Sequence, residues 1–503
     1  MNANGKQLHS NTRSESRFAR LAALAGLVSL AGCATPPYEA PPTVAAIETA
    51  AAYHADSGTA TSAAQISATA SWWRSVGGDD LDSLVRTLLA QSLDLEIARA
   101  RIEQSEALRR QARGAQLPAV DASLGISETR SQGDEFGSSP FIGGVGGGGS
   151  NFASFGTDTY SAALNVNWDV DIFGELRRGT RAAELSLTAA QLRETATAQT
   201  LVSQLARAWV ELGTLQRRVE LQRNIADSFR TTADLTDQRY RNGSDSTTAA
   251  DVEIARSNHA SAQARLPELE FQLARQAIAI DTLLGRLPGT TFDQLDNIRL
   301  PDELDQPPVG MPADLMTRRP DVAAAELEFR AALEDIGAAR ARLFPGLSLT
   351  SSLTFRGQDT DAFDWDSHVA TLASSLLAPI FQGGRLRAQV RASEAVAREL
   401  AASYSATALA AVADVETALL AESAFSSQTE RYTENVRAAA LADELSQNRY
   451  RQGLSTLLRV LEAQRSLNTA RESLILAEQQ RLLARIDLYQ ALGGNWMPDA
   501  NNP

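Results

Sequence analysis

One run of 68 residues, from Arg385 to Gln452, contains neither glycine nor proline. At a rise of 1.5 Å per residue, a continuous helix of this length would extend about 100 Å. Helices in ordinary globular domains are about 8 to 20 residues long. The sequence therefore predicts a helical rod, and the fold must supply this rod with partners along its length.

The segment that follows the rod carries apolar residues at alternating intervals of three and four. They are Val460, Ala463, Leu467, Ala470, Leu474 and Ala477. This spacing is the heptad seam of a coiled coil, although an amphipathic helix of any bundle has nearly the same period. The length of the rod favours coiled-coil packing.

The rod belongs to an internal repeat with a spacing of about 210 residues. Arg239-Tyr240-Arg241-Asn242-Gly243 returns as Arg449-Tyr450-Arg451-Gln452-Gly453, so the chain uses one structural unit twice. The predicted organisation is a first repeat at 71–290, a linker at 291–311, a second repeat at 312–497 and a C-terminal tail at 498–503.

Four stretches between the helical runs alternate apolar and polar residues, a period of two that predicts strands. They cover about 118–128, 159–172, 346–356 and 367–380. Strands of about ten residues with one apolar and one polar face suit a membrane barrel with a water-filled interior. A half-buried sheet of a soluble protein alternates in the same way. The candidate aromatic girdle that would distinguish the two consists of Trp168, Phe173, Trp365 and Phe381.

The number of strands restricts the membrane interpretation. Four strands cannot close a barrel, because the smallest known membrane barrels have about eight. Open strand edges are not tolerated in lipid, so several chains would each have to contribute a sector. Two copies would give eight strands and three would give twelve, and strand physics alone leaves both numbers open.

The N-terminus has the features of a secretory signal. Four basic residues precede an apolar run at 21–30, and this run is too short for a membrane-spanning helix. It ends in Leu30-Ala31-Gly32-Cys33, which resembles the lipobox where bacterial lipoproteins are cleaved and acylated on cysteine. We therefore predict a signal peptide at 1–32 and a lipidated, palmitate-bearing Cys33, the alternative being a lone buried thiol. Residues 33–70, rich in proline, alanine, serine and threonine, are predicted to form a tether.

Composition argues against several functions. The net charge is −14, and it becomes −17 once the signal peptide with four basic residues and one acidic residue is removed, which disfavours nucleic-acid binding. The four histidines are scattered, and no zinc-ligand spacing or nucleophile elbow is found. We expect no enzymatic activity, no cofactor and no metal. A secreted enzyme and a lipid-anchored coiled-coil scaffold without channel activity remain the competing interpretations.

Several motifs together resemble a known family. They are Trp72-Trp73, Leu81-Asp82-Ser83-Leu84, Leu95-Glu96-Ile97-Ala98-Arg99-Ala100-Arg101, Asp171-Ile172-Phe173-Gly174 and Pro379-Ile380-Phe381-Gln382-Gly383-Gly384-Arg385. With these motifs the mature chain is similar throughout to the outer-membrane efflux factors, the TolC-like proteins, and among them to the NodT-type and OprM-type lipoproteins.

The resemblance implies a fold and a function. The fold is α+β: a homotrimer with a twelve-stranded outer-membrane β-barrel, four strands per chain, continuous with a long periplasmic coiled-coil barrel of helices. The function is a passive exit duct of a tripartite efflux system, anchored in outer-membrane lipid. An inner-membrane transporter of the RND or a related type loads the duct, and a periplasmic adaptor docks on the helical tips.

The resemblance also implies roles for residues at the tips. Asp251 and Tyr450 match a pair that latches neighbouring helix pairs, and Glu462 matches a position in a ring of carboxylates at the periplasmic gate. The sequence departs from the family pattern at Arg459, where another ring carboxylate is expected, and at Ser455, where a latch arginine is expected. The expected adaptor-docking positions are Gly243, Gly453 and Leu454.

Each of these residues also has a simpler explanation. Asp251 suits the cap or first turn of the helix after the tip. Tyr450 suits packing in the seam, while Glu462 and Arg459 suit a solvated surface. His259, at a seam position with no histidine nearby in sequence, is interpreted as a packing residue and not as a ligand.

Overall fold

A computed structural model describes residues 71–132, 154–243, 247–290, 298–301, 318–357 and 368–493. Cys33, the predicted signal peptide and tether, most of the linker, Trp365 and the C-terminal tail lie outside these ranges. The chain divides into two compact units. Among the described residues, the sheet unit comprises residues from 106–185 and 330–398, and the helical unit comprises the rest.

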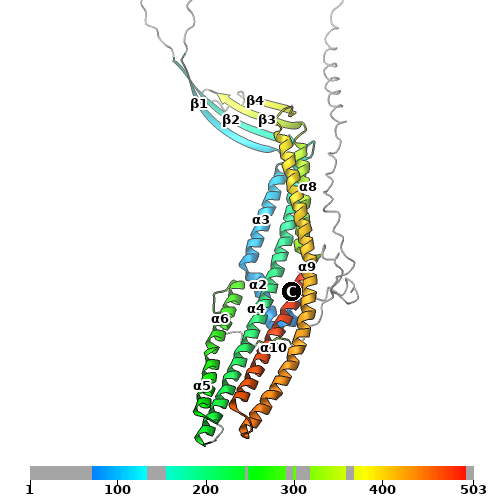
Figure 1. The fold of residues 1–503 in the computed structure, drawn as a ribbon. Coiled ribbons are helices and arrows are strands. Elements are labelled where there is room, and N and C mark those ends of the chain that lie inside the picture. Colours follow the sequence, from blue (N-terminus) through cyan, green and yellow to red (C-terminus); the bar gives the residue numbers. More distant parts are fainter. Residues whose placement is uncertain are drawn as a thin grey trace, which may run out of the picture. The chain divides into compact units, whose positions relative to one another are not determined.

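Long helices dominate the chain (Figure 1). They are α2 (Trp73–Gln91), α3 (Leu93–Gly114), α4 (Glu175–Arg241), α5 (Ala249–Ala264), α6 (Leu266–Leu283), α8 (Pro320–Ala341), α9 (Arg385–Arg451) and α10 (Leu457–Ala491). Helices α4 and α9 each have 67 residues and begin 210 positions apart, which confirms the rod and the internal repeat. None of the described helices is both long enough and apolar enough to qualify as a membrane span.

The four predicted strands form one antiparallel sheet in the order β1-β2-β3-β4. Their bounds are β1 Ala119–Gln132, β2 Ser154–Val170, β3 Gly346–Gly357 and β4 His368–Leu377. Strands β1 and β2 extend further toward their connection than the predicted ranges, because backbone pairing such as Glu128↔Asp158 continues where the side-chain alternation stops. Strands β1 and β4 are the two edges of the sheet.

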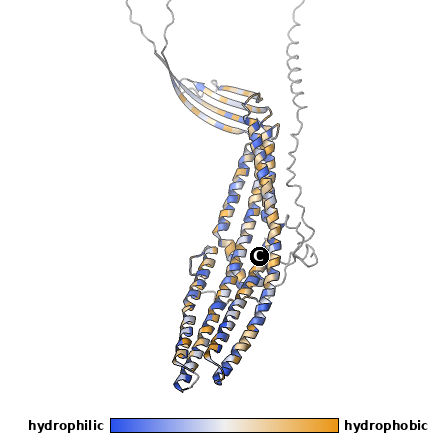
Figure 2. Cartoon of the chain, in the orientation of Figure 1, coloured by the Kyte–Doolittle hydropathy of each residue, from blue (hydrophilic) through white to orange (hydrophobic). Residues whose placement is uncertain are grey.

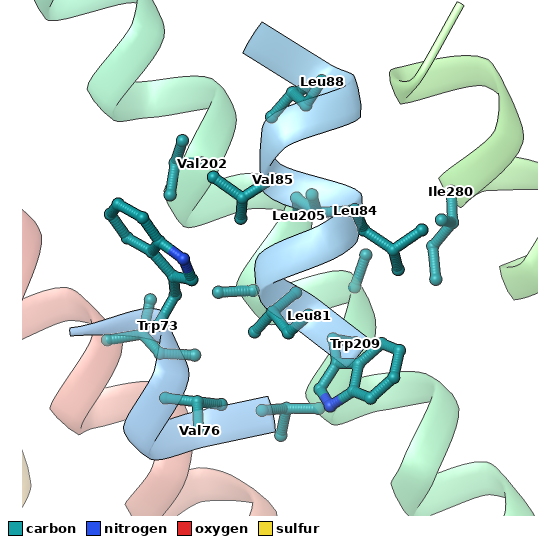
Figure 3. Packing of buried hydrophobic residues seen from close by; sticks show 14 of the residues in the cluster. Trp73, Val76, Leu81, Leu84, Val85, Leu88, Val202, Leu205, Trp209 and Ile280 are labelled. Atoms are coloured by element: carbon teal, nitrogen blue, oxygen red, sulfur yellow. The ribbon is translucent and has the colours of Figure 1, made fainter. Parts of the chain in front are cut away.

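The core of the helical unit is built around α2 (Figure 3). Trp73, Leu81 and Leu88 of α2 pack with residues of α4 and α6, among them Leu205 and Ile280, in one buried cluster. Each fully buried side chain of this size contributes about 2 kcal/mol. The Trp-Trp motif and the two Leu-containing motifs that follow it contribute Trp72, Trp73, Leu81, Leu84 and Leu95 to this cluster, so we assign those motifs a packing role.

A buried carboxylate joins the start of α2 to its middle. Asp82 accepts hydrogen bonds from the indole nitrogen of Trp73 at 2.9 Å and from Arg74 at 2.7 Å, and it also pairs with Arg86 at 2.8 Å. Only 9% of its side chain is exposed. The Arg74 hydrogen bond, the Trp73 hydrogen bond and the two nearby positive charges lower the pKa of Asp82 to about 2, against the opposing effect of burial.

This site predicts a pH-dependent stability. A carboxylate whose pKa is lower in the folded state stabilises the fold above its unfolded pKa of about 3.9 and loses this contribution as the pH falls through about 2. Asp82→Asn retains the acceptor for Trp73 but removes the charge, so we expect a loss of about 2 kcal/mol at pH 7 that disappears near pH 2. Thermal unfolding followed by circular dichroism at several pH values measures the difference.

The matched control is Asp80→Asn, which removes an exposed carboxylate two residues away. It should change the unfolding temperature little at any pH. An Asp82→Asn deficit that is the same at pH 3 and pH 7 would contradict the assignment.

Candidate functional site: a two-faced sheet and two helical tips

One face of the sheet is apolar and exposed. Paired residues of neighbouring strands point to the same face, and this face carries the even-numbered residues of β1, β2 and β4 and the odd-numbered residues of β3. Its exposed apolar residues include Val120, Leu124, Ile126, Leu164, Leu372 and Leu376. Leu124 is 83% exposed and Leu372 is 82% exposed. Contiguous apolar surface of this kind marks contact with a membrane or a partner.

The opposite face is polar and hollow. Asp121, Asn165, Asn167, Thr350, Ser352 and Thr371 of this face line a cavity of about 340 Å³, which Ser351, by register a residue of the apolar face, also borders. The alternation of the two faces is visible along the strands in Figure 2. The sheet thus curves around its polar side chains, as a sector of a barrel does when its interior holds water.

Aromatic residues at the end of the sheet pack within the sheet unit. The rings of Phe173 and Phe344 stack with centroids 4.9 Å apart. The indole nitrogen of Trp168 donates to the backbone oxygen of Gln116 at 3.0 Å, whereas Phe381 is 88% exposed. Of the four girdle candidates, Phe173 is therefore engaged by a ring contact, Phe381 is free to meet another surface, and Trp365 lies outside the described residues.

The tip between α4 and α5 begins at Gly243, whose φ of 70° is readily adopted only by glycine. Thr248 is the N-cap of α5, and its hydroxyl accepts the backbone N–H of Asp251 at 3.2 Å. The Asp251 carboxylate in turn accepts the backbone N–H and the hydroxyl of Thr248, each at 2.8 Å. This is a capping box, so within one chain Asp251 serves the helix start.

The tip between α9 and α10 begins at Gly453, whose φ is 78°. The backbone N–H of Leu454 donates to the oxygen of Arg449 at 2.9 Å, and that of Gly453 donates to the oxygen of Tyr450 at 2.9 Å. These two bonds form a Schellman motif, which satisfies carbonyls at the end of α9. Gly243, Gly453 and Leu454 are all exposed, and Leu454 presents a 65% exposed side chain.

Tyr450 packs against α4. The residue is 2% exposed, and its hydroxyl lies 3.2 Å from the hydroxyl of Thr236. The Arg239 guanidinium lies 4.5 Å from the ring centroid and donates to the Tyr450 backbone oxygen. Within the described part of a single chain, Asp251 and Tyr450 form no bond with each other.

Arg459 and Glu462 lie on the exposed surface of α10. Their charged atoms are 3.8 Å apart, and their side chains are 77% and 55% exposed. A surface pair of this kind contributes little to stability. The structure thus brings these two gate candidates together and leaves both accessible at the tip.

Several residues of the tips were missed by the sequence analysis. Gln464 is 2% exposed, and its amide donates to the hydroxyls of Ser228 at 3.1 Å and Thr232 at 2.9 Å. Ser228, Thr232 and Thr236 recur at intervals of four, so they lie on one face of α4. This interval of four between hydroxyl residues is the sequence pattern that could have identified the site. His259 binds the backbone oxygen of Ala226 at 3.0 Å, as a packing residue does.

Comparison with known proteins identifies relatives along most of the chain. Residues 84–286 and 311–494 match the family model described as outer membrane efflux protein. The pyoverdine export outer membrane protein OpmQ of Pseudomonas aeruginosa is 34% identical over 432 residues, covering 85% of this chain and 88% of OpmQ. Nodulation protein T of Rhizobium leguminosarum is 31% identical over 488 residues, covering 95% and 94%.

A solved structure shares the fold. The outer-membrane channel OprN superposes with a TM-score of 0.81 at 25% sequence identity, and the match covers 92% of this chain and 99% of OprN. The combination of a four-stranded sheet and long helices is therefore the fold of an outer-membrane channel.

Proposed function

The chain belongs to the outer membrane efflux protein family, and we propose that three copies of it form the outer-membrane exit duct of a tripartite efflux pump. The observation that carries this proposal is the two-faced sheet. Its exposed apolar face suits lipid, and its hollow polar face suits a water-filled passage. The described residues hold no group of three or more metal-ligating side chains, and absence of enzymatic activity or a cofactor remains a prediction.

The edges of the sheet support assembly from several copies. Because β1 and β4 each pair with only one neighbour among the described residues, each presents an edge to the next copy. The strands alternate in direction, so β4 of one copy is antiparallel to β1 of the next. Twelve strands from three copies close such a barrel, and the family resemblance favours three over two.

The proposed partners follow from the role of an exit duct. Relatives in this family are transport proteins of efflux and export systems. We propose that a periplasmic adaptor docks at the exposed tips around Gly243, Gly453 and Leu454, and that an inner-membrane transporter of the RND or a related type loads the duct. OpmQ is named for pyoverdine export. A passive duct receives its cargo from its transporter.

The scaffold and the enzyme are weaker explanations. A lipid-anchored coiled-coil scaffold accounts for the rods and seams, but it gives no role to a sheet with an exposed apolar face. A secreted enzyme needs converging reactive groups, and the polar face of the sheet carries mainly amides and hydroxyls.

The assembly is testable with two substitutions at neighbouring positions. The purified wild-type protein should have the mass of three chains in detergent and conduct ions in planar bilayers. Leu164→Arg places a charge on the apolar face, at a cost of about 2 to 4 kcal/mol near the bilayer midplane. We therefore expect much less assembled protein in the outer-membrane fraction, measured by native mass spectrometry of the extracted protein.

Asn165→Arg is the matched control, because the same side chain then points to the polar face. It should assemble as the wild type does. A non-conducting wild-type monomer, or equal loss of assembly in the two variants, would be incompatible with the proposed duct.

The lipid anchor is proposed on the lipobox alone. Cys33 is the only cysteine of the chain and stands directly after the predicted signal peptide. Cells that express the protein should incorporate radioactive palmitate into it, and Cys33→Ser should abolish the label while Ser29→Ala, outside the cysteine position, should retain it. Label that survives in Cys33→Ser would remove the assignment.

We propose that the tips form the periplasmic gate, with Asp251 and Tyr450 joining neighbouring chains. Asp251 lies in the first turn of α5, and its capping bonds leave further lone pairs on the carboxylate. The family resemblance leads us to expect a carboxylate at both ring positions. In this chain one position is Arg459 and the other is Glu462, so the two positions carry opposite charges. We therefore infer that the aperture repels anions less than an all-carboxylate ring does.

The gate predicts a change in conductance. Asp251→Ala combined with Tyr450→Phe removes both polar groups of the proposed latch, so single-channel conductance in planar bilayers should rise. Thr248→Ala is the control, because it disrupts the capping box but retains the Asp251 carboxylate. If the double variant conducts as the wild type does, the latch assignment is wrong.

A further inference from the structure

A single row of polar side chains crosses all four strands on the hollow face of the sheet. The register pairs Asp121 with Asn165, Asn165 with Ser352, and Ser352 with Thr371. All four residues line the cavity of about 340 Å³. We call these four residues the polar row.

The polar row carries one charge. The amide and hydroxyl groups of Asn165, Ser352 and Thr371 both donate and accept hydrogen bonds, whereas an ionised carboxylate only accepts. Asp121 forms no ion pair with another described residue. The nearest arginine of this face by register is Arg356, which pairs with Ser161 and lies four residues beyond Ser352 along β3. The carboxylate charge is therefore not neutralised within the row.

We propose that the polar row is a selectivity ring that favours cations over anions. This inference rests on the proposed function, because closure by three copies places three Asp121 carboxylates at one level of a water-filled passage. Carboxylates that line a water-filled passage raise the local concentration of cations and lower that of anions. The neutral members of the row offer hydrogen bonds to replace part of the solvation of a passing solute.

The opposite charges at the tips leave the polar row as the more important source of cation preference in this chain. Arg459 and Glu462 on α10 carry opposite charges at an accessible site. Three copies therefore bring equal numbers of these positive and negative side chains, so this pair gives no net preference for cations. Asp121 supplies an uncompensated charge that does not depend on the tips.

The experiment moves the charge between two strands of the same row. Reversal potentials in planar bilayers under a KCl gradient give the ratio of K⁺ to Cl⁻ permeability. The wild type should favour K⁺. Asp121→Asn should lower the ratio roughly two- to threefold, Asn165→Asp should raise it by a similar factor, and the double variant should return it close to the wild-type value.

Asp80→Asn, an exposed site on α2, is the matched control for loss of one carboxylate per chain and should leave the ratio unchanged. Conducting channels whose permeability ratio is the same in wild type, Asp121→Asn and Asn165→Asp would overturn the selectivity ring while leaving the duct intact. If Asp121→Asn fails to assemble, the permeability ratio of Asn165→Asp is sufficient to test the proposal. An unchanged ratio in Asn165→Asp also overturns it. Absence of any wild-type conductance would instead contradict the proposed function.

Discussion

Lipid offers no hydrogen-bond partner to an unpaired backbone N–H or C=O group, so these groups must pair with each other inside a membrane. This constraint governs the whole architecture. The sheet has four strands with one apolar exposed face, so in a membrane the edges of β1 and β4 require other strands. The described part of the chain contains no further strand that could pair with them. A single chain therefore supplies only a sector of the barrel, and the passage forms only when several copies assemble.

The two ends of the helical unit are held together by different interactions. Around α2, large apolar side chains, three tryptophans among them, fill a compact core, and a buried carboxylate fixes the start of the helix. Toward the tips, alanines, hydroxyls and buried amides such as Gln464 replace many of the large side chains. Contacts such as Gln464 with Thr232, and Tyr450 with Thr236, are directional and individually modest. A region held in this way suits the gate that we propose at the tips, whereas the α2 core suits a fixed support.

Sequence reasoning predicted the elements better than the contacts at the tips. The resemblance singled out Asp251 and Tyr450, and the residues alone suggested a cap and a seam position. Within one chain, Asp251 does form a capping box and Tyr450 is buried, while their role between chains remains a proposal. Thr248, Thr236 and Arg239 were missed. A Thr three residues before an Asp is common in sequences. The pair can be recognised as a capping box only when the start of the helix is known, as it is here for Thr248 and Asp251.

The sequence by itself determined the rods, the repeat and the two faces of each strand, because helical and strand periods are properties of the local backbone. It also determined that one chain has too few strands to close a barrel. Only the tertiary structure decided which member of a repeated pair is buried: Tyr450 is 2% exposed, whereas Tyr240 in the same motif is 47% exposed. The two motifs are nearly identical, but Tyr450 contacts Thr236 and Arg239, which lie more than two hundred positions earlier in the chain. Burial depends on that packing, and no local pattern contains it.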